Sequence, residues 1–244
     1  MSLLPLSLPA SQALTAYFWH GETIRSRSVS SVVLTSTVNV PALPLRMSAD
    51  CERDIAGHLA LAPGDVEALS LARACTRWPD FKIFVQAASG WTCDLGLQDL
   101  LPLSDIALMA CRGARYHQDA EQYGGTAFCN LFLSEDKGLD LHFPHTGHRI
   151  ALARGTVVIF DTGQPHAVIQ RGGNGFDVGD FAPGRDCTSL FLTWELPIEN
   201  AQIAQALGVD FDTDLATALR LTEEQVHLKG VRVGVCPETG NWRQ

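Results

Sequence analysis

The feature that most constrains the fold is a series of short apolar segments between residues 104 and 194. Gly, Pro, Asp and Asn separate these segments, and β-branched and aromatic residues are frequent within them. They read DIALMACRGARYH, GTAFCNLFL, LDLHF, HRIAL, TVVIFD, HAVIQR and CTSLFLTWEL. Several short strands with turn residues at such spacing are typical of a sandwich or barrel of the jelly-roll kind. The sequence therefore predicts a mainly β fold with a jelly-roll core.

The regions on either side of this core have different patterns. Before it, SVVLTSTVNV (31–40) and FKIFVQA (81–87) predict strands, while SADCERDIAGHLAL and APGDVEALSLARACTRW predict helices. After it, ENAQIAQALGV and DTDLATALRLTEEQV have the apolar spacing of helices, and Asp212 or Thr213 is the expected N-cap of the second.

A chain of 244 residues is long enough for one well-buried domain. We expect a single domain over residues 1–244, with a mixed helix and strand region at 1–103, the β core at 104–196 and a helical region at 197–244. The flanking helices are expected to pack on the outside of the sheets.

Composition excludes several kinds of partner. The formal charge of −9 gives nucleic acid or an anionic membrane no basic patch to bind. No apolar run has the length of a membrane span, and the opening MSLLPLSLPASQAL lacks the charged start of a secretory signal. The seven cysteines occur singly, without a CxxC pair, as expected for free thiols in a reducing compartment. We therefore expect a cytoplasmic protein that binds neither nucleic acid nor a membrane; the pattern leaves the oligomeric state open.

The sequence YHQDA contains a possible pair of metal ligands, His117 and Asp119. If this segment is a strand, alternation places both side chains on one face, where a single metal ion can contact both. A second histidine would complete the facial triad of non-haem Fe(II) oxygenases, which leaves three coordination positions open. The best candidate is His166 in GTVVIFDTGQPHAVIQR, where it opens a strand after a turn. An ordinary strand-edge histidine and a turn carboxylate are the alternative interpretation.

The order of these motifs resembles the Fe(II) and 2-oxoglutarate dependent oxygenases, especially their prolyl-hydroxylase-like branch. The resemblance covers residues 112 to 194: a His-x-Asp, the run LFLSEDKGLDLHFP, the glycine-led strand RGTVVIFDTGQPHAV and finally GRDCTSLFLTW. It implies a double-stranded β-helix with Fe(II) on His117, Asp119 and His166. It also implies 2-oxoglutarate as cosubstrate with O2, release of succinate and CO2, and hydroxylation, desaturation or cyclisation of a small or amino-acid-like substrate. The carboxylate of Asp119 argues against halogenation, since halogenating members lack it.

The distal carboxylate of 2-oxoglutarate requires a basic partner, and the planar fork of an arginine suits it. Two arginines are candidates. Arg171 lies five residues after His166, on the same predicted strand, and Arg185 lies on the next one. The family pattern favours Arg185, although the usual position of the arginine is occupied here by Cys187, one alternation later.

Two other functions remain open. The glycine-led strand also fits the second motif of the cupins, with Asp161 where cupins usually have Pro, so a cupin-type metalloenzyme that does not use 2-oxoglutarate is one alternative. A non-catalytic β-helix module that binds a ligand is the other.

Three further features have a structural and a functional interpretation. His142, His145 and His148 are expected to be hairpin and rim residues rather than a second metal cluster. The glycine-rich segment 172–184 is either a lid over the metal or a plain connection. Five aromatic residues are expected to be core rather than a substrate cage: Trp78, Trp91, Phe128, Phe132 and Trp194.

Overall fold

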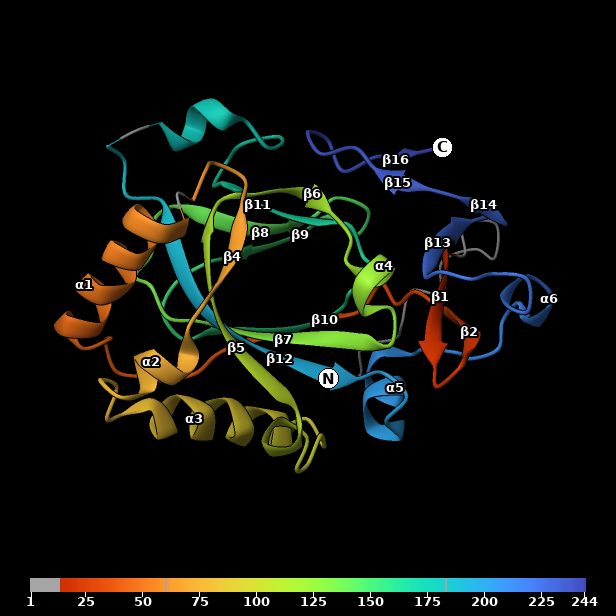
Figure 1. Ribbon diagram of the computed structural model, residues 1–244, viewed down its shortest axis with the longest axis horizontal. Coiled ribbons are helices and arrows are strands. Elements are labelled where there is room, and N and C mark those ends of the chain that lie inside the picture. The colour runs from red at the N-terminus through yellow and green to blue at the C-terminus, as the bar shows by residue number, and fades with distance from the viewer. Residues whose placement is uncertain (1–13, 60, 183) are drawn as a thin grey trace.

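The computed structural model describes residues 14–59, 61–182 and 184–244. At its centre two antiparallel sheets face each other (Figure 1). The larger sheet has the strand order β3-β10-β7-β12-β5-β4 and the smaller one β6-β11-β8-β9. From β5 to β8, and again from β9 to β12, consecutive strands alternate between the two sheets, which is the topology of a double-stranded β-helix. The prediction of a mainly β fold with a jelly-roll core is confirmed.

Every segment predicted as a strand in the core forms one. The smaller sheet contains β6 (Ala114–His117), β11 (His166–Gln170), β8 (Leu139–Phe143) and β9 (His148–Ala151). The larger sheet contains β3 (Val33–Thr37), β10 (Thr156–Asp161), β7 (Thr126–Phe132), β12 (Thr188–Pro197), β5 (Asp105–Arg112) and β4 (Val66–Leu69).

The central strands of the larger sheet are buried on both faces. On β12, Leu192 and Trp194 point outward into a core that the helices cover, while Phe191, directly before Leu192, points inward, into the core that separates the two sheets. Because alternate residues face opposite sides, one strand contributes to both cores. Thr193 and Glu195 share the inward face with Phe191 and line a cavity there.

Helices cover the outer face of the larger sheet (Figure 1). They are α1 (Leu45–Asp54) with a π-helical continuation (Ile55–Leu59), α2 (Leu71–Cys75), α3 (Phe81–Asp94), a short 3-10 turn (Leu101–Leu103) and α5 (Ala201–Leu207). The predicted strand at 81–87 is wrong, since it is the first half of α3. Phe84, Ala88 and Thr92 are its buried residues, and their spacing of four places them on one helical face. The predicted helix at 62–78 is partly wrong, because β4 occupies its middle.

The C-terminal region is not mainly helical, contrary to the prediction. After α6 (Leu215–Ala218), whose N-cap is Asp214 rather than Asp212 or Thr213, the chain forms β13 (Gln225–Leu228), β14 (Val231–Arg232), β15 (Gly234–Val235) and β16 (Trp242–Arg243). Strand β13 pairs with β1 (Leu14–His20), which pairs with β2 (Thr23–Ser28). This third sheet, β14-β13-β1-β2, lies beside the barrel (Figure 1).

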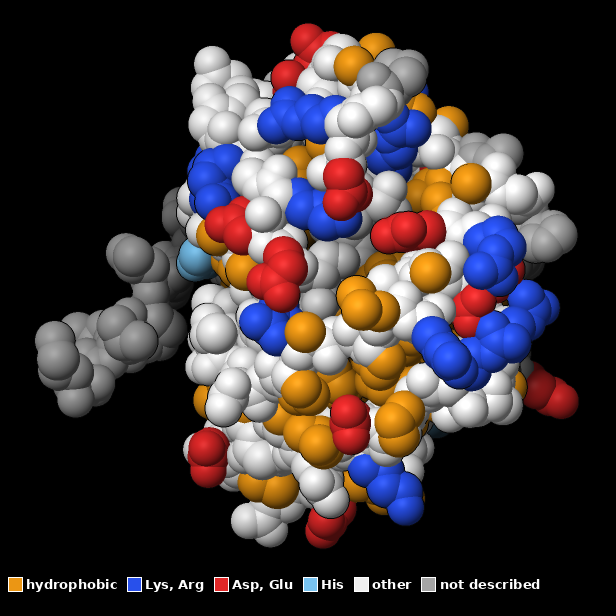
Figure 2. Space-filling view, turned by 90° about the vertical axis from the view of Figure 1, so that its left-hand side faces the viewer, with side chains coloured by type: hydrophobic (Ala, Val, Ile, Leu, Met, Phe, Trp, Pro, Cys, Tyr) orange, Lys and Arg blue, Asp and Glu red, His pale blue; other side chains and the backbone are white. Residues whose placement is uncertain are grey.

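All seven cysteines are free thiols, as predicted. On the face that carries α1, hydrophobic side chains gather in the lower half, with acidic and basic side chains around them (Figure 2). Among the described residues no helix has both the length and the apolar character to cross a membrane. The opening segment, from which the sequence predicted no secretory signal, lies outside the described residues up to residue 13.

Candidate metal centre

Three predicted ligands converge at one end of the barrel. His117 is the last residue of β6 and His166 is the first of β11, and the two are directly paired across these adjacent antiparallel strands. Asp119 is the N-cap of the short helix α4 (Ala120–Tyr123) that follows β6. The three side chains therefore meet, although not by the predicted alternation along one strand. The strand ends at His117, and the turn into α4 returns the Asp119 carboxylate toward the histidines.

The geometry of the triad suits a single metal ion. The Nε2 atom of His117 lies 3.6 Å from Asp119 Oδ1, and the Nε2 atom of His166 lies 3.5 Å from Asp119 Oδ2. All candidate ligand atoms lie within 4.8 Å of one another. Adjacent ligands on an octahedral ion with bonds near 2.1 Å are about 3 Å apart, so a small contraction suffices for coordination. No other cluster of three or more His, Cys, Asp or Glu side chains with converging ligand atoms occurs in the described part of the chain.

Hydrogen bonds hold both histidines in the tautomer that a metal needs. The Nδ1 atom of His117 lies 2.6 Å from the carbonyl oxygen of Arg115, and that of His166 lies 2.9 Å from the carbonyl oxygen of Gln164. A carbonyl oxygen only accepts, so each Nδ1 carries a proton and donates it, and Nε2 is the ring nitrogen that faces the centre. Burial, followed by the proximity of His117, lowers the pKa of His166 to about 4. His166 is therefore neutral near pH 7 and able to bind a cation.

The turn that carries His166 is fixed to the turn that carries Asp119. The backbone N–H of Asp119 donates to the carbonyl oxygen of Thr162 over 2.8 Å. The Thr162 hydroxyl lies 2.8 Å and 2.9 Å from the carbonyl oxygens of Tyr123 and Thr126. These contacts set the spacing of two ligands that come from different strands of the barrel.

A buried ion pair secures the same turn from outside the barrel. Both side chains of the pair are fully buried, and Arg27 of β2 donates to Asp161 from Nη1 over 2.6 Å and from Nη2 over 2.9 Å. Arg27 Nε also donates to the carbonyl oxygen of Gly124, directly after α4. The Asp161 carboxylate accepts from the backbone N–H groups of Ser30 and Gly163. Asp161, singled out in the sequence because cupins usually have Pro there, thus connects the third sheet to both metal-ligand turns.

The triad opens into a cavity of about 320 Å³ between the two sheets. Its wall is largely apolar and aromatic, and besides His117, Asp119 and His166 the residues lining it are Val66, Ala68, Ala107, Met109, Cys111, Ala114, Tyr123, Phe128, Asn130, Phe132, Leu141, Phe160, Val168, Phe191, Thr193 and Glu195. Phe160 packs its ring 4.8 Å from that of His166. The size and the apolar wall are those of a site for a small organic molecule.

Sequence reasoning missed the polar groups of this wall. Asn130 interrupts the apolar strand β7 between Phe128 and Phe132, and Glu195 follows Phe191 and Thr193 at the inward spacing of β12. The signal was a polar residue at a position where alternation requires an inward side chain. Phe128 and Phe132, expected in the core, also line the cavity.

The structure does not bring either predicted arginine to the cavity. Arg171 is held by Asp136 and Asp140, with its Nε 2.8 Å from Asp140 Oδ1 and its Nη1 2.8 Å from Asp136 Oδ2. Arg185 is exposed, and its Nη1 donates to the carbonyl oxygen of Asp180 over 3.3 Å. Among the described residues that line the cavity, none is Lys or Arg.

The other candidate residues have structural contacts. His142 pairs with the hydroxyl of Tyr116 and His145 with the carbonyl oxygen of Gly240, while His148 contacts Thr146, so these histidines do not form a second cluster. In the segment 172–184, which includes a short 3-10 helix (Val178–Phe181), the rings of Phe176 and Phe181 stack 5.4 Å apart.

This segment lies away from the triad. Phe181 packs against Gly113, at the end of β6 opposite His117. The structure of the described part of this segment therefore favours a plain connection over a lid on the triad.

Comparison with known proteins adds little to this geometry. No protein-family model matches the chain, and no curated protein matches it. A prolyl-4-hydroxylase from Pseudomonas putida is similar in structure over 67% of this chain and 91% of its own, with 20% identity and a TM-score of 0.40. A viral collagen prolyl hydroxylase from Paramecium bursaria Chlorella virus-1, solved with 2-oxoglutarate, is similar over 67% and 93%, with 10% identity and a TM-score of 0.38. With TM-scores below 0.5, these similarities identify neither a family nor an activity.

Proposed function

We propose that this protein is a mononuclear non-haem Fe(II) oxygenase that oxidises a small organic molecule. The observation that supports the proposal is the triad itself: two histidines and one carboxylate on a double-stranded β-helix, facing a largely apolar cavity. Two imidazoles and a carboxylate that occupy one face of an ion are the ligand set of Fe(II) oxygenases. Fe(II), when bound, supplies the activation of O2 that no side chain can provide.

The residues of this chain would ligate, orient and exclude water. His117 and His166 offer Nε2 atoms whose direction is fixed by their Nδ1 hydrogen bonds, and Asp119 adds a negative charge that offsets part of the ion's charge. Phe160 and Phe128 form the apolar wall beside the ligands, which limits water near the reacting groups. The cavity beside the triad would give a substrate and O2 access to the coordination positions that the protein leaves free.

The expected cosubstrate, 2-oxoglutarate, fits this cavity at one end only. Its 2-oxo-acid end could use the open positions on the metal. Its distal carboxylate finds no cation among the described lining residues, and the cavity already contains the carboxylates of Asp119 and Glu195. Burial of an unpaired carboxylate costs several kcal/mol, on the order of the full desolvation of the group. This favours the second candidate from the sequence, a cupin-type Fe(II) enzyme that takes no 2-oxoglutarate.

One titration tests the metal site and the cosubstrate in turn. Fe(II) is added anaerobically to metal-free protein, and 2-oxoglutarate follows while the visible absorption is recorded. We expect one Fe(II) per chain, and loss of binding in His166→Ala, with His148→Ala as the control because His148 lies outside the triad. If His166→Ala bound Fe(II) with wild-type affinity, the proposed function would be refuted. A charge-transfer band with 2-oxoglutarate, together with succinate release on addition of O2, would select the 2-oxoglutarate dependent dioxygenase; absence of both supports the cupin-type enzyme.

A further inference from the structure

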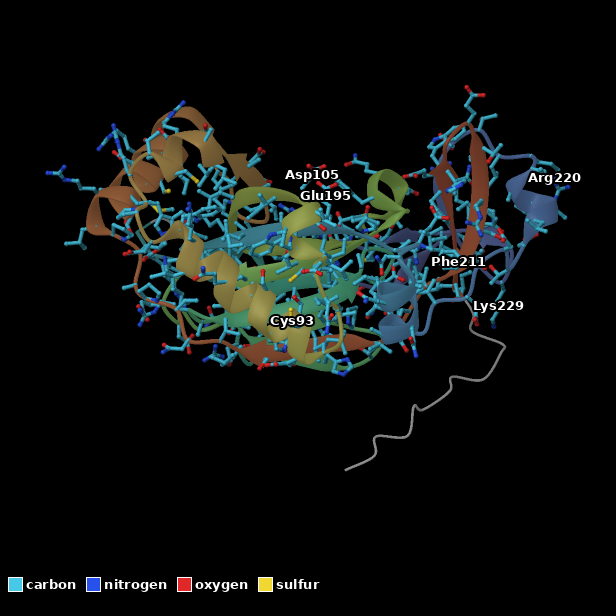
Figure 3. All side chains as sticks on the ribbon, turned by 90° about the horizontal axis from the view of Figure 1, so that it is seen from below. Cys93, Asp105, Glu195, Phe211, Arg220 and Lys229 are labelled. Atoms are coloured by element: carbon cyan, nitrogen blue, oxygen red, sulfur yellow. The ribbon has the colours of Figure 1, made fainter. Side chains whose placement is uncertain are left out.

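A row of polar side chains crosses the inner face of the larger sheet, opposite the triad. Glu195 of β12 and Asp105 of β5 are direct partners across the two strands (Figure 3). Directly opposed side chains share one face of a sheet, with Cβ atoms about 5 Å apart. Both carboxylates therefore point to the same side, and Glu195 reaches the wall of the metal cavity.

Neither of these two carboxylates forms an ion pair within the described part of the chain. Other acidic side chains, such as Glu199, Asp186 and Asp136, do pair with an arginine or a lysine. Burial, and next the charge of Asp105, raise the pKa of Glu195. Two adjacent carboxylates repel each other, and a positive group between them would relieve the repulsion.

Aromatic rings adjoin the carboxylates on the other side. Phe128 of β7 is the direct partner of Glu195, and the ring of Tyr123 lies 5.2 Å from that of Phe128. Both rings line the cavity. A carboxylate next to aromatic faces is an environment that favours a cation, since the ring faces carry negative potential.

Deeper in the cavity, Asn130 presents a polar group that the protein itself does not use. Its side chain lines the cavity and the residue is only 7% exposed, yet its Oδ1 atom has no hydrogen-bond partner in the described structure. Thr193 is its direct partner on β12, so Asn130 lies one diagonal step from Glu195 on the same face. Buried polar groups are almost always paired, and this amide is left unpaired in the wall of the cavity, where a ligand can hydrogen-bond to it.

We propose that the substrate of this cavity carries a cationic nitrogen group, an ammonium or a guanidinium, which binds between Glu195 and Asp105 while Asn130 hydrogen-bonds a second polar group of the same molecule. The carboxylates accept hydrogen bonds from the N–H groups of the cation, and Phe128 and Tyr123 cover its apolar stem. The cation would thus be held on the larger sheet, and the remainder of the molecule would extend toward the triad on the facing sheet. This inference rests on the proposed function, because it assigns the substrate class of the same cavity.

The test uses defined probes and does not depend on turnover. Arginine, lysine, agmatine and cadaverine are added to the metal-free protein, and citrulline and norleucine serve as uncharged counterparts of arginine and lysine. Ligand-observed NMR measures binding. We expect at least one cationic probe to bind, with at least tenfold preference over its uncharged counterpart. Equal binding of the charged and uncharged probes, or no binding of any cationic probe, would overturn the inference.

Three substitutions locate the binding group. Glu195→Gln keeps the size of the side chain and should weaken binding of the cationic probe at least tenfold. Glu67→Gln is the matched control, since Glu67 lies on β4 between the cavity residues Val66 and Ala68 and therefore points away from the cavity. Asn130→Leu should weaken binding of the cationic probe. It should not lower the melting temperature, because the wild-type amide oxygen has no internal partner among the described residues. Unchanged binding in Glu195→Gln would refute the assignment.

The proposals for the substrate class and for the metal site can be refuted independently. Mn(II) binding to the triad is measured by itself, and the relaxation of probe protons in the Mn(II)-loaded protein then reports whether the probe lies near the ion. Loss of Mn(II) binding with retained preference for cations would reject the oxygenase and keep the cation site. Mn(II) binding without preference for cations would keep the metal site and reject the cation site.

Discussion

The buried pair of Arg27 and Asp161 gives the strongest prediction about stability. Replacing Arg27 with Met keeps the apolar length of the side chain and removes its charge. The Asp161 carboxylate, fully buried, would then keep only its two backbone donors, from Ser30 and Gly163. Removing one partner of a buried ion pair costs about 3–5 kcal/mol, because the remaining charge is uncompensated. We expect Arg27→Met to lower the free energy of unfolding by about that amount.

Arg25 provides a matched control on the same strand. It lies one alternation before Arg27 and pairs with Asp212 over 2.7 Å and with Glu199, but its side chain is 28% exposed. Exposed ion pairs contribute about 0–1 kcal/mol, so Arg25→Met should lower the free energy of unfolding by no more than about 1 kcal/mol. The two variants differ in burial far more than in chemistry.

Urea unfolding followed by circular dichroism measures both variants and Asp161→Leu/Arg27→Met. The double variant should recover part of the stability that Arg27→Met loses, because no charge remains buried. Fe(II) affinity should also fall in Arg27→Met, since Arg27 connects the His166 turn to Gly124 beside α4. If Arg27→Met and Arg25→Met unfold at the same urea concentration, the buried pair does not stabilise the fold as reasoned here.

Three further predictions concern the triad and the barrel. Asp119→Ala should weaken Fe(II) binding at least tenfold without unfolding the protein, measured by anaerobic titration, and an unchanged affinity would exclude Asp119 as a ligand. The metal-free protein should lose stability as the pH falls from about 6.5 to 4: burial holds the pKa of His166 at about 4, so the unfolded chain binds the proton first, and His166→Phe should flatten this part of the stability profile. Gly113→Ala should lower the melting temperature, because Gly113 has φ of 66° and an added Cβ would lie 2.4 Å from the ring of Phe181; an unchanged melting temperature would show that the loop bearing Phe181 does not pack there.

The sequence predicted the barrel well because its strands are short, apolar and separated by turn residues. All seven apolar segments between residues 104 and 194 form strands in the two facing sheets. Segment 81–87 misled because aromatic and β-branched residues suggest a strand over seven residues, whereas the helical period of Phe84, Ala88 and Thr92 appears only over the full length of α3. The strands β13 to β16 were missed because each is only two to four residues long, and because β13 also pairs with β1, more than 200 residues earlier in the chain.

The three members of the triad were predicted, but the reason for their convergence was not. Alternation along one strand would have sufficed for His117 and Asp119, yet the structure uses the turn into α4. The wall of the cavity opposite the triad was not predicted, since a single Asn or Glu in an apolar strand has no local signal beyond its inward position. Arg171 and Arg185 show the limit of motif spacing: their partners, Asp136, Asp140 and the carbonyl oxygen of Asp180, are contacts that only the folded chain defines.

The third sheet has a consequence for the order in which the protein is completed during synthesis. Strand β1 emerges from the ribosome early, but its partner β13 lies at residues 225–228, so the early hairpin of β1 and β2 lacks a neighbour while the whole barrel is being made. Arg27, on β2, meets Asp161 only once β10 is available, and the sheet that holds Arg27 is complete later still. The barrel strands have all been synthesised before that sheet can close. Assembly of the two turns that carry the triad is thereby coupled to the last strands of the chain, and a chain interrupted before β13 would have a barrel whose triad turns lack the completed third sheet.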